Sequence, residues 1–347
     1  MEFTLEQVKS VGRKPEFDNF LKVLACEKPT RYTLGEIFIN DELLSLAAGV
    51  ESFPKDLYEG HKTRISAFAN LGYDYFSGPG SWFSFQKGEK HHGDSISQNE
   101  GALIFDQDSF AAYSWNNPDD FDYSVLQKIS SDLPSGMKGM IYGPGGVLEN
   151  VTDLCGYDNL CYLLADDEEL VAEIFDHVGS RLVRYYEICA SYDSVGVLVV
   201  NDDWGFNTQT MLSTEDMRRF VIPWHKRIAE VVHQTGKPTL MHSCGNLEKV
   251  YDDIIDGIKH DGKHSFEDKI EPVEKAYDRL AGRIALVGGI DVDYLARRSP
   301  QEIYDRSLNM LRKTQCKGYA LGAGNSIPKF IPHENYFAML CAALLGE

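Results

Sequence analysis

The chain has 347 residues, of which 53 are acidic and 34 are basic, for a formal net charge of -19. This charge repels phosphate backbones, so we expect no nucleic-acid partner. The first residues lack a basic start followed by an apolar core, and no apolar run reaches membrane-spanning length, which favours a cytoplasmic protein without a membrane partner. The seven cysteines are scattered and odd in number, which indicates thiols rather than a disulfide framework.

Short apolar runs alternate with amphipathic helical patterns along the chain. After an N-terminal helical extension, seven runs are predicted to be strands: 72–76, 140–142, 196–200, 238–241, 258–264, 284–288 and 318–321. Most of them lead into a glycine-rich or polar loop. This pattern is typical of a parallel sheet whose carboxyl ends carry the chemistry.

The eighth strand is ambiguous. Residues 101–105 could supply it, or they could pair with 82–85 as a hairpin insertion over the mouth. The helices between the strands have recognisable starts at Asp166, Ser213 and Ser299, each followed by acidic residues in the first turn. We therefore expect an α/β fold, a (β/α)8 TIM barrel with an N-terminal helical extension, in which residues 1–347 form one domain.

His242 and Cys244 are the most informative pair. They stand two residues apart at the end of the predicted strand 238–241 and precede Gly245. Alternation along a strand points residues i and i+2 to the same side, so an imidazole and a thiol could meet one ion. Zinc accepts both ligand types. The alternative is a buried cysteine beside a hydrogen-bonded histidine.

Several segments carry a resemblance to a known family. They are Leu240 to Asn246, Gly143 to Gly145, and Gly318 to Pro328 followed by Pro332 to Asn335. These segments resemble the uroporphyrinogen decarboxylase superfamily, and the His-x-Cys-Gly stretch is similar to its branch of zinc- and corrinoid-dependent methyltransferases. The resemblance runs from near Arg31 to the C-terminus and implies the barrel independently of the strand count.

The chain departs from both branches of that superfamily. Where the decarboxylases carry a Met-Arg-Gln-Ala-Gly-Arg signature that binds substrate carboxylates, this chain has Arg31 to Phe38, with one arginine. A tetrapyrrole with many carboxylates needs several cationic partners. The C-terminal loop, which holds a histidine in the decarboxylases and a third zinc ligand, a cysteine, in the methyltransferases, has Ala323 or Gly324 at the matching position.

We therefore look for a third metal ligand at neighbouring strand ends. His264 and Glu267 follow the next strand and are the first choice, while Asp203 and Asp291 close the strands on either side. Each of these carboxylates could instead be a helix cap or an ion-pair partner. The expected metal ligands are His242, Cys244 and His264.

The resemblance implies methyl transfer, with zinc activating a thiol acceptor or a small-molecule methyl donor and with a corrinoid carried by a separate partner protein. Two alternatives stay open. A metal-independent decarboxylase-like lyase would use an acid such as Asp203, with Arg31 binding a carboxylated substrate. A non-catalytic corrinoid-handling protein would fit the loss of both residues at Ala323. The candidate catalytic residues are Asp203, Arg31 and Glu267.

Overall fold

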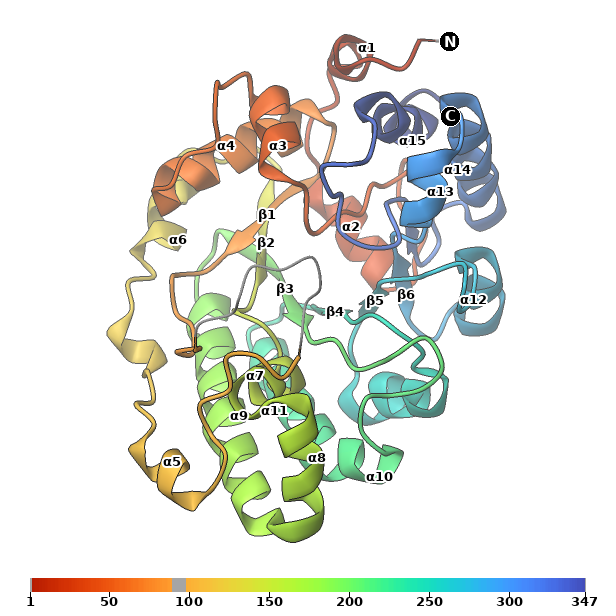
Figure 1. Cartoon of the computed structure of the whole chain (residues 1–347). Coiled ribbons are helices and arrows are strands. Elements are labelled where there is room, and N and C mark those ends of the chain that lie inside the picture. Colours follow the sequence, from red (N-terminus) through yellow and green to blue (C-terminus); the bar gives the residue numbers. More distant parts are fainter. Residues whose placement is uncertain (1, 89–97, 347) are drawn as a thin grey trace.

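The computed structural model describes residues 2–88 and 98–346, and its centre is a sheet of seven parallel strands (Figure 1). The strands are β1 (Tyr75–Pro79), β2 (Lys138–Tyr142), β3 (Val195–Asn201), β4 (Thr239–His242), β5 (Gly262–His264), β6 (Ala285–Val287) and β7 (Tyr319–Ala320). Their spatial order follows the sequence order. The predicted α/β fold is confirmed.

Helices surround this sheet. The N-terminal extension is α1 (Leu5–Ser10), α2 (Phe17–Leu24), α3 (Asp41–Ala48) and α4 (Leu57–Asn70). The others are α5 (Gln107–Ala112), α6 (Ser124–Lys128), α7 (Val147–Cys155), α8 (Tyr157–Asp166), α9 (Glu168–Ala190), α10 (Thr214–Asp216), α11 (Ile222–His233), α12 (Val273–Leu280), α13 (Val292–Arg297), α14 (Pro300–Thr314) and α15 (His333–Leu345). Ser213 and Ser299 cap their helices as predicted, whereas Asp167 rather than Asp166 caps α9.

The eighth position of the sheet is taken by a segment that the sequence did not indicate. The Gly35 N–H donates to the Leu321 carbonyl (2.7 Å), and the Leu321 N–H donates to the Thr33 carbonyl (2.9 Å), as in a parallel ladder. Toward β1, the Tyr75 hydroxyl bonds the backbone N–H and carbonyl of Glu36. Residues 33–36 therefore connect the two edge strands of the sheet.

The prediction that 101–105 forms the eighth strand or a hairpin is wrong for the described residues. The N–H groups of Leu103 and Ile104 both donate to the Leu154 carbonyl at the end of α7, so this segment is tied to a helix. In the other half of the predicted hairpin, residues 82–85, Phe83 and Phe85 are buried against aromatic neighbours rather than paired in a ladder.

The predicted strand at 258–264 is also shortened. Residues 253–258 form a π-helical turn, and Lys259 follows with φ of 71°, so that only Gly262–His264 remains extended.

The strands are buried because helices cover the sheet. In β3 and β4, every residue from Val195 to Val200 and from Thr239 to His242 is buried, as expected for parallel strands rich in Val, Leu and Met. Helices α7, α8, α9 and α11 gather at one side of the sheet, and α12 to α15 at another (Figure 1). Among the described helices, none combines the length and apolar character needed to cross a membrane.

Candidate metal centre at the carboxyl end of the sheet

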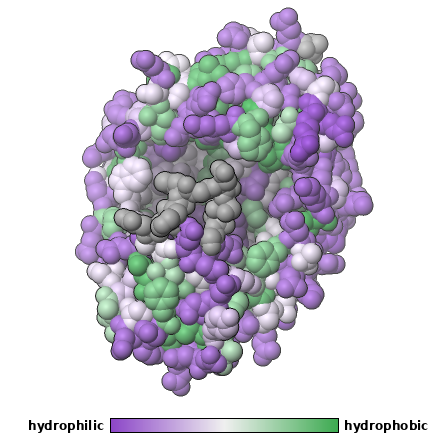
Figure 2. Space-filling view, viewed as in Figure 1, coloured by the Kyte–Doolittle hydropathy of each residue, from purple (hydrophilic) through white to green (hydrophobic). Residues whose placement is uncertain are grey.

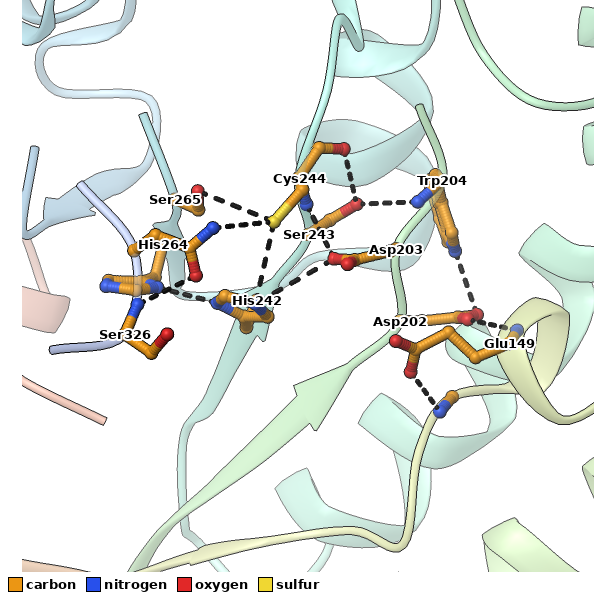
Figure 3. Close-up of polar contacts among 12 residues, drawn as sticks. Glu149, Asp202, Asp203, Trp204, His242, Ser243, Cys244, His264, Ser265 and Ser326 are labelled. Carbon is orange, nitrogen blue, oxygen red and sulfur yellow. Dashed lines mark hydrogen bonds and ion pairs between the residues drawn. The ribbon is translucent and has the colours of Figure 1, made fainter. Parts of the chain in front are cut away.

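Asp203, His242 and Cys244 converge beyond the carboxyl ends of β3 and β4 (Figure 3). The strand register pairs Asn201 with His242, so the residues that follow β3 lie beside the β4 end. His242 Nε2 is 3.9 Å from Cys244 Sγ and 3.8 Å from Asp203 Oδ1. The Cys244 N–H donates to Asp203 Oδ1 (2.8 Å), which ties the two loops together.

These atoms suit zinc in both chemistry and spacing. Nitrogen, thiolate sulfur and carboxylate oxygen are all zinc ligands, and at zinc bond lengths such ligands lie about 3.3–3.6 Å apart. The two spacings above exceed this by a few tenths of an ångström. Burial lowers the pKa of His242 to about 4, so the ring is neutral and keeps a lone pair for coordination. Burial and the Asp203 carboxylate raise the pKa of the Cys244 thiol to about 12, so a bound cation would favour loss of its proton.

His264, the expected third ligand, lies behind His242 instead. Its Nδ1 is 2.7 Å from Nδ1 of His242, so the contact leaves Nε2 of His242 facing Cys244 and Asp203. Burial keeps the pKa of His264 well below its usual value, so both rings are neutral and one Nδ1 donates its proton to the other. This is the position of a residue that orients a metal-binding histidine. Asp203, another of the candidates for the third ligand, is the residue whose carboxylate lies with His242 Nε2 and Cys244 Sγ.

The C-terminal loop reaches the thiol through Asn325. Its Nδ2 donates to Cys244 Sγ (3.1 Å), and the Ser265 hydroxyl lies 3.8 Å from the same sulfur. The two loop residues considered from the sequence do not reach it. Ala323 is fully buried and its N–H donates to Glu36 Oε1, while a Cβ at Gly324 would stand 2.1 Å from the Phe266 carbonyl oxygen.

The other predicted site residues lie elsewhere. Arg31 pairs with Asp74 (2.5 Å), which directly precedes β1, so its guanidinium lies at the end of the sheet opposite His242. Its predicted binding of a substrate carboxylate is not supported by this position. Glu267 lines a separate cavity of about 340 Å³ between the loops that follow β4 and β5. Asp291 caps α13 and accepts from the Asp268 N–H, which is a structural role.

A second acidic group lies beside Asp203. The buried carboxylate of Asp202 accepts from the N–H groups of Leu148 and Glu149, from Trp204 Nε1 and from His225 Nε2, so it is satisfied as an anion. The Glu149 carboxyl accepts a hydrogen bond from the Gly146 N–H, fewer than Asp202 accepts. Burial and the charges of Asp202 and Asp203 raise its pKa to about 8, so it holds a proton at neutral pH.

A row of side chains that leads away from His242 could not be predicted from the sequence. The Phe38 ring meets His242 edge-on (5.4 Å between centroids) and packs against Tyr142 at the end of β2 (5.0 Å). The charge of Arg64 on α4 acts on the Tyr142 hydroxyl, and its guanidinium covers the ring of Phe53. Only the assembled fold joins these segments. Figure 2 shows a hollow in this face of the molecule with a largely hydrophilic rim.

Parts of the sequence match known proteins. Residues 129–343 match the sequence model of the family described as uroporphyrinogen decarboxylase (URO-D). A methylated-thiol–coenzyme M methyltransferase of Methanosarcina mazei is 25% identical over 177 residues, which cover 50% of this chain and 46% of that protein. A uroporphyrinogen decarboxylase of Anaeromyxobacter dehalogenans is 31% identical over 136 residues, or 38% of this chain and 36% of that protein. The chain thus matches less than half the length of each of these two curated relatives.

The fold has a solved counterpart. A structure described as a methyltransferase from Methanosarcina mazei superposes with a TM-score of 0.63 at 18% identity, covering 99% of this chain and 98% of that one. This similarity extends over the whole chain and concerns the fold.

Proposed function

The chain belongs to the uroporphyrinogen decarboxylase family, and from that premise we propose that it is a zinc-dependent methyltransferase that methylates a thiol or demethylates a methylated thiol. The observation that carries the proposal is the convergence of His242 Nε2, Cys244 Sγ and an Asp203 carboxylate oxygen within 4.8 Å of one another. A decarboxylase that binds the carboxylates of its substrate through several cationic side chains does not need these zinc ligands. A curated relative named as a methylated-thiol–coenzyme M methyltransferase supports the same choice.

Zinc held by these three side chains would leave a coordination position for substrate and would supply Lewis acidity that makes a thiolate available at neutral pH. His264 orients His242, and Asn325 and Ser265 contact the Cys244 sulfur. In the reaction, the substrate thiol releases its proton to solvent and its sulfur forms a bond to the methyl carbon. The bond between that carbon and its carrier breaks, and the electron pair leaves on the carrier.

We propose a corrinoid on a separate protein as the methyl carrier, because cobalt accepts that electron pair and the chain lacks the corrinoid-binding pattern Asp-x-His-x-x-Gly. We place the docking of this partner on the hollowed face in Figure 2. All seven cysteines are free thiols, which is consistent with the reducing cytoplasm that we propose as its location.

Free methylcobalamin and simple thiols provide the test. We expect the zinc-loaded protein to consume methylcobalamin, followed by its visible absorbance, in the presence of a thiol. Cys244→Ala and Asp203→Asn should reduce the rate by at least about 100-fold. Cys161→Ala, an exposed cysteine on α8, is the matched control and should leave it unchanged. No thiol-dependent consumption by the zinc-loaded protein would contradict the proposal.

A metal-independent lyase is the second candidate, and one observation favours it. Glu149 holds a proton at neutral pH beside two carboxylates, so it is available as a general acid. Such an enzyme would act on a carboxylated substrate in the presence of a chelator and would depend on Glu149 rather than on Cys244.

A further inference from the structure

Lys263 is a buried cation directly behind the metal centre. It lies on β5 in register with Met241 of β4, and only 1% of its surface is exposed. Within the described chain, no carboxylate forms an ion pair with it, although burying an unpaired ammonium is costly. Its partners are therefore the reason that the position tolerates a charge.

Those partners are three backbone carbonyls. Nζ donates to the carbonyl oxygens of Ser243 (2.9 Å), His264 (3.1 Å) and Ser265 (2.7 Å). A neutral amine has two hydrogens and an ammonium has three, so three acceptors require the charged form. The Phe266 ring stands 4.9 Å from Nζ and covers it from another side.

The three carbonyls belong to the two turns that carry the metal site. Ser243 is the residue between His242 and Cys244, and its N–H donates to the His264 carbonyl (2.9 Å). Ser265 contacts the Cys244 sulfur, and His264 orients the ring of His242. One ammonium thus joins the carboxyl ends of β4 and β5 at the point where each leaves the sheet.

The charge of Lys263 acts on the same site. Its electrostatic interactions include Cys244, Asp203 and Glu267. A thiolate and a carboxylate with zinc form a neutral set, so a positive charge behind them favours an anionic fourth group such as a substrate thiolate.

We propose that Lys263 is a positioning residue for the metal centre: it fixes His242, Cys244 and Ser265 in one arrangement through three carbonyl bonds, and its charge stabilises the anionic ligands. The proposal rests on the proposed zinc function. Without the Lys263 ammonium the two turns would separate, and the Cys244 thiolate would lose the buried positive charge that acts on it.

Lys263→Met tests this, because methionine has a similar length but neither charge nor donors. Zinc alone is titrated into the chelator-treated proteins against a chromophoric competitor. We expect Lys263→Met to bind zinc at least about tenfold more weakly than wild type, in the range of second-shell losses. With cobalt(II) in place of zinc, the sulfur-to-cobalt absorption band should weaken. Lys226→Met, an exposed lysine on α11, makes the same charge change and should match wild type.

The controls separate a positioning role from a purely structural one. The thermal unfolding of the metal-free variant is recorded in parallel, since a structural role alone would lower that midpoint and leave zinc affinity and the cobalt spectrum as in wild type. If Lys263→Met does not fold, the wild type is labelled with ¹⁵N-lysine. A slowly exchanging Lys263 ammonium resonance that shifts on adding zinc supports the proposal, and an ammonium that exchanges as fast as the surface lysines overturns it.

The zinc affinities of wild type and Lys263→Met distinguish a failure of this inference from a failure of the proposed function. A wild type that binds zinc together with a Lys263→Met variant of equal affinity overturns the role of Lys263 alone. A wild type that binds no zinc overturns both this inference and the proposed function.

Discussion

At the scale of single residues, the environment of the Cys244 sulfur decides what the site can bind. Asn325 Nδ2, His242 Nε2 and the Ser265 hydroxyl surround it within 4 Å. An amide nitrogen donates a hydrogen bond and does not coordinate a cation. The C-terminal loop therefore comes close to the candidate metal centre without adding a ligand to it.

Asn325→Cys should convert that contact into a ligand. A thiolate at this position would face the metal beside Cys244, so we expect zinc to bind at least about tenfold more tightly, measured by chelator competition. Asn325→Ala removes the amide without adding a ligand and is the control. Gly324→Cys should instead distort the loop, because its Cβ would stand 2.1 Å from the Phe266 carbonyl oxygen. Unchanged zinc affinity in Asn325→Cys would show that the loop does not face the metal.

His242 and Cys244 were predictable because alternation along a strand is a local rule. Asp203 could be named only as one of four possible third ligands, since its approach depends on the hydrogen bond from the Cys244 N–H across two loops. Asn325 was missed because the path of a glycine-rich loop is not encoded in spacing. A shift of one or two residues decided which side chain met the sulfur.

At the scale of elements, the turn after β4 has little freedom. Gly245 has φ of 87°, and a Cβ there would stand 2.1 Å from the Gly205 carbonyl oxygen in the loop after β3. A side chain would have to separate the two loops that carry Cys244 and Asp203.

Gly245→Ala should therefore destabilise the fold by about 1–3 kcal/mol and weaken zinc binding at the same time. Gly257→Ala is the matched control, because a Cβ there meets no atom within 4 Å, and it should be close to neutral. Urea unfolding and zinc competition on both variants measure the two effects. Equal zinc affinity in Gly245→Ala and wild type would mean that the close approach of the loops does not matter.

The closing segment 33–36 contains a buried acid whose titration opposes folding at high pH. Burial raises the pKa of Glu36 to about 8, and its Oε1 accepts from the Ala323 N–H. An unfolded chain releases this proton near its ordinary pKa of about 4.5, so the contribution of Glu36 to stability is complete below that pH. It is lost as the pH rises toward 8.

Glu36→Gln keeps the acceptor but cannot ionise. Relative to wild type, the variant should gain stability by roughly a few kcal/mol between pH 4.5 and pH 8, measured by urea unfolding. The pKa of Glu149 is raised in the same direction, but Glu149 is present in both proteins and cancels in the comparison. Parallel curves for the two proteins across this range would exclude the buried acid as the cause.

Most strands could be predicted from apolar runs that end in polar loops, and the closing segment could not. Residues 33–35 offer only three residues to the ladder, and the Tyr75 hydroxyl replaces strand pairing on the β1 side. The segment 101–105 looked more like a strand because it is apolar, yet its N–H groups bond to the end of α7. The local sequence shows that a segment is apolar, but which segment its backbone bonds to depends on the whole fold.

At the scale of the whole molecule, the order of the seven strands brings the loops after β3, β4 and β5 together, and this places one carboxylate, one imidazole and one thiol at a single point. Strand alternation and glycine-rich loops predicted this parallel arrangement, and family resemblance supplied its closure. Alternation also paired His242 with Cys244, but it did not predict which side chains of the neighbouring loops would face that pair, since this depends on backbone bonds that cross between the loops.

Zinc content tests the central claim most directly. We expect wild type, purified without chelator and supplied with zinc, to hold about one zinc ion per chain, and His242→Ala and Cys244→Ala to hold almost none. Cys161→Ala should behave as wild type. A wild-type protein that holds no zinc and still transfers methyl groups to a thiol would contradict the account.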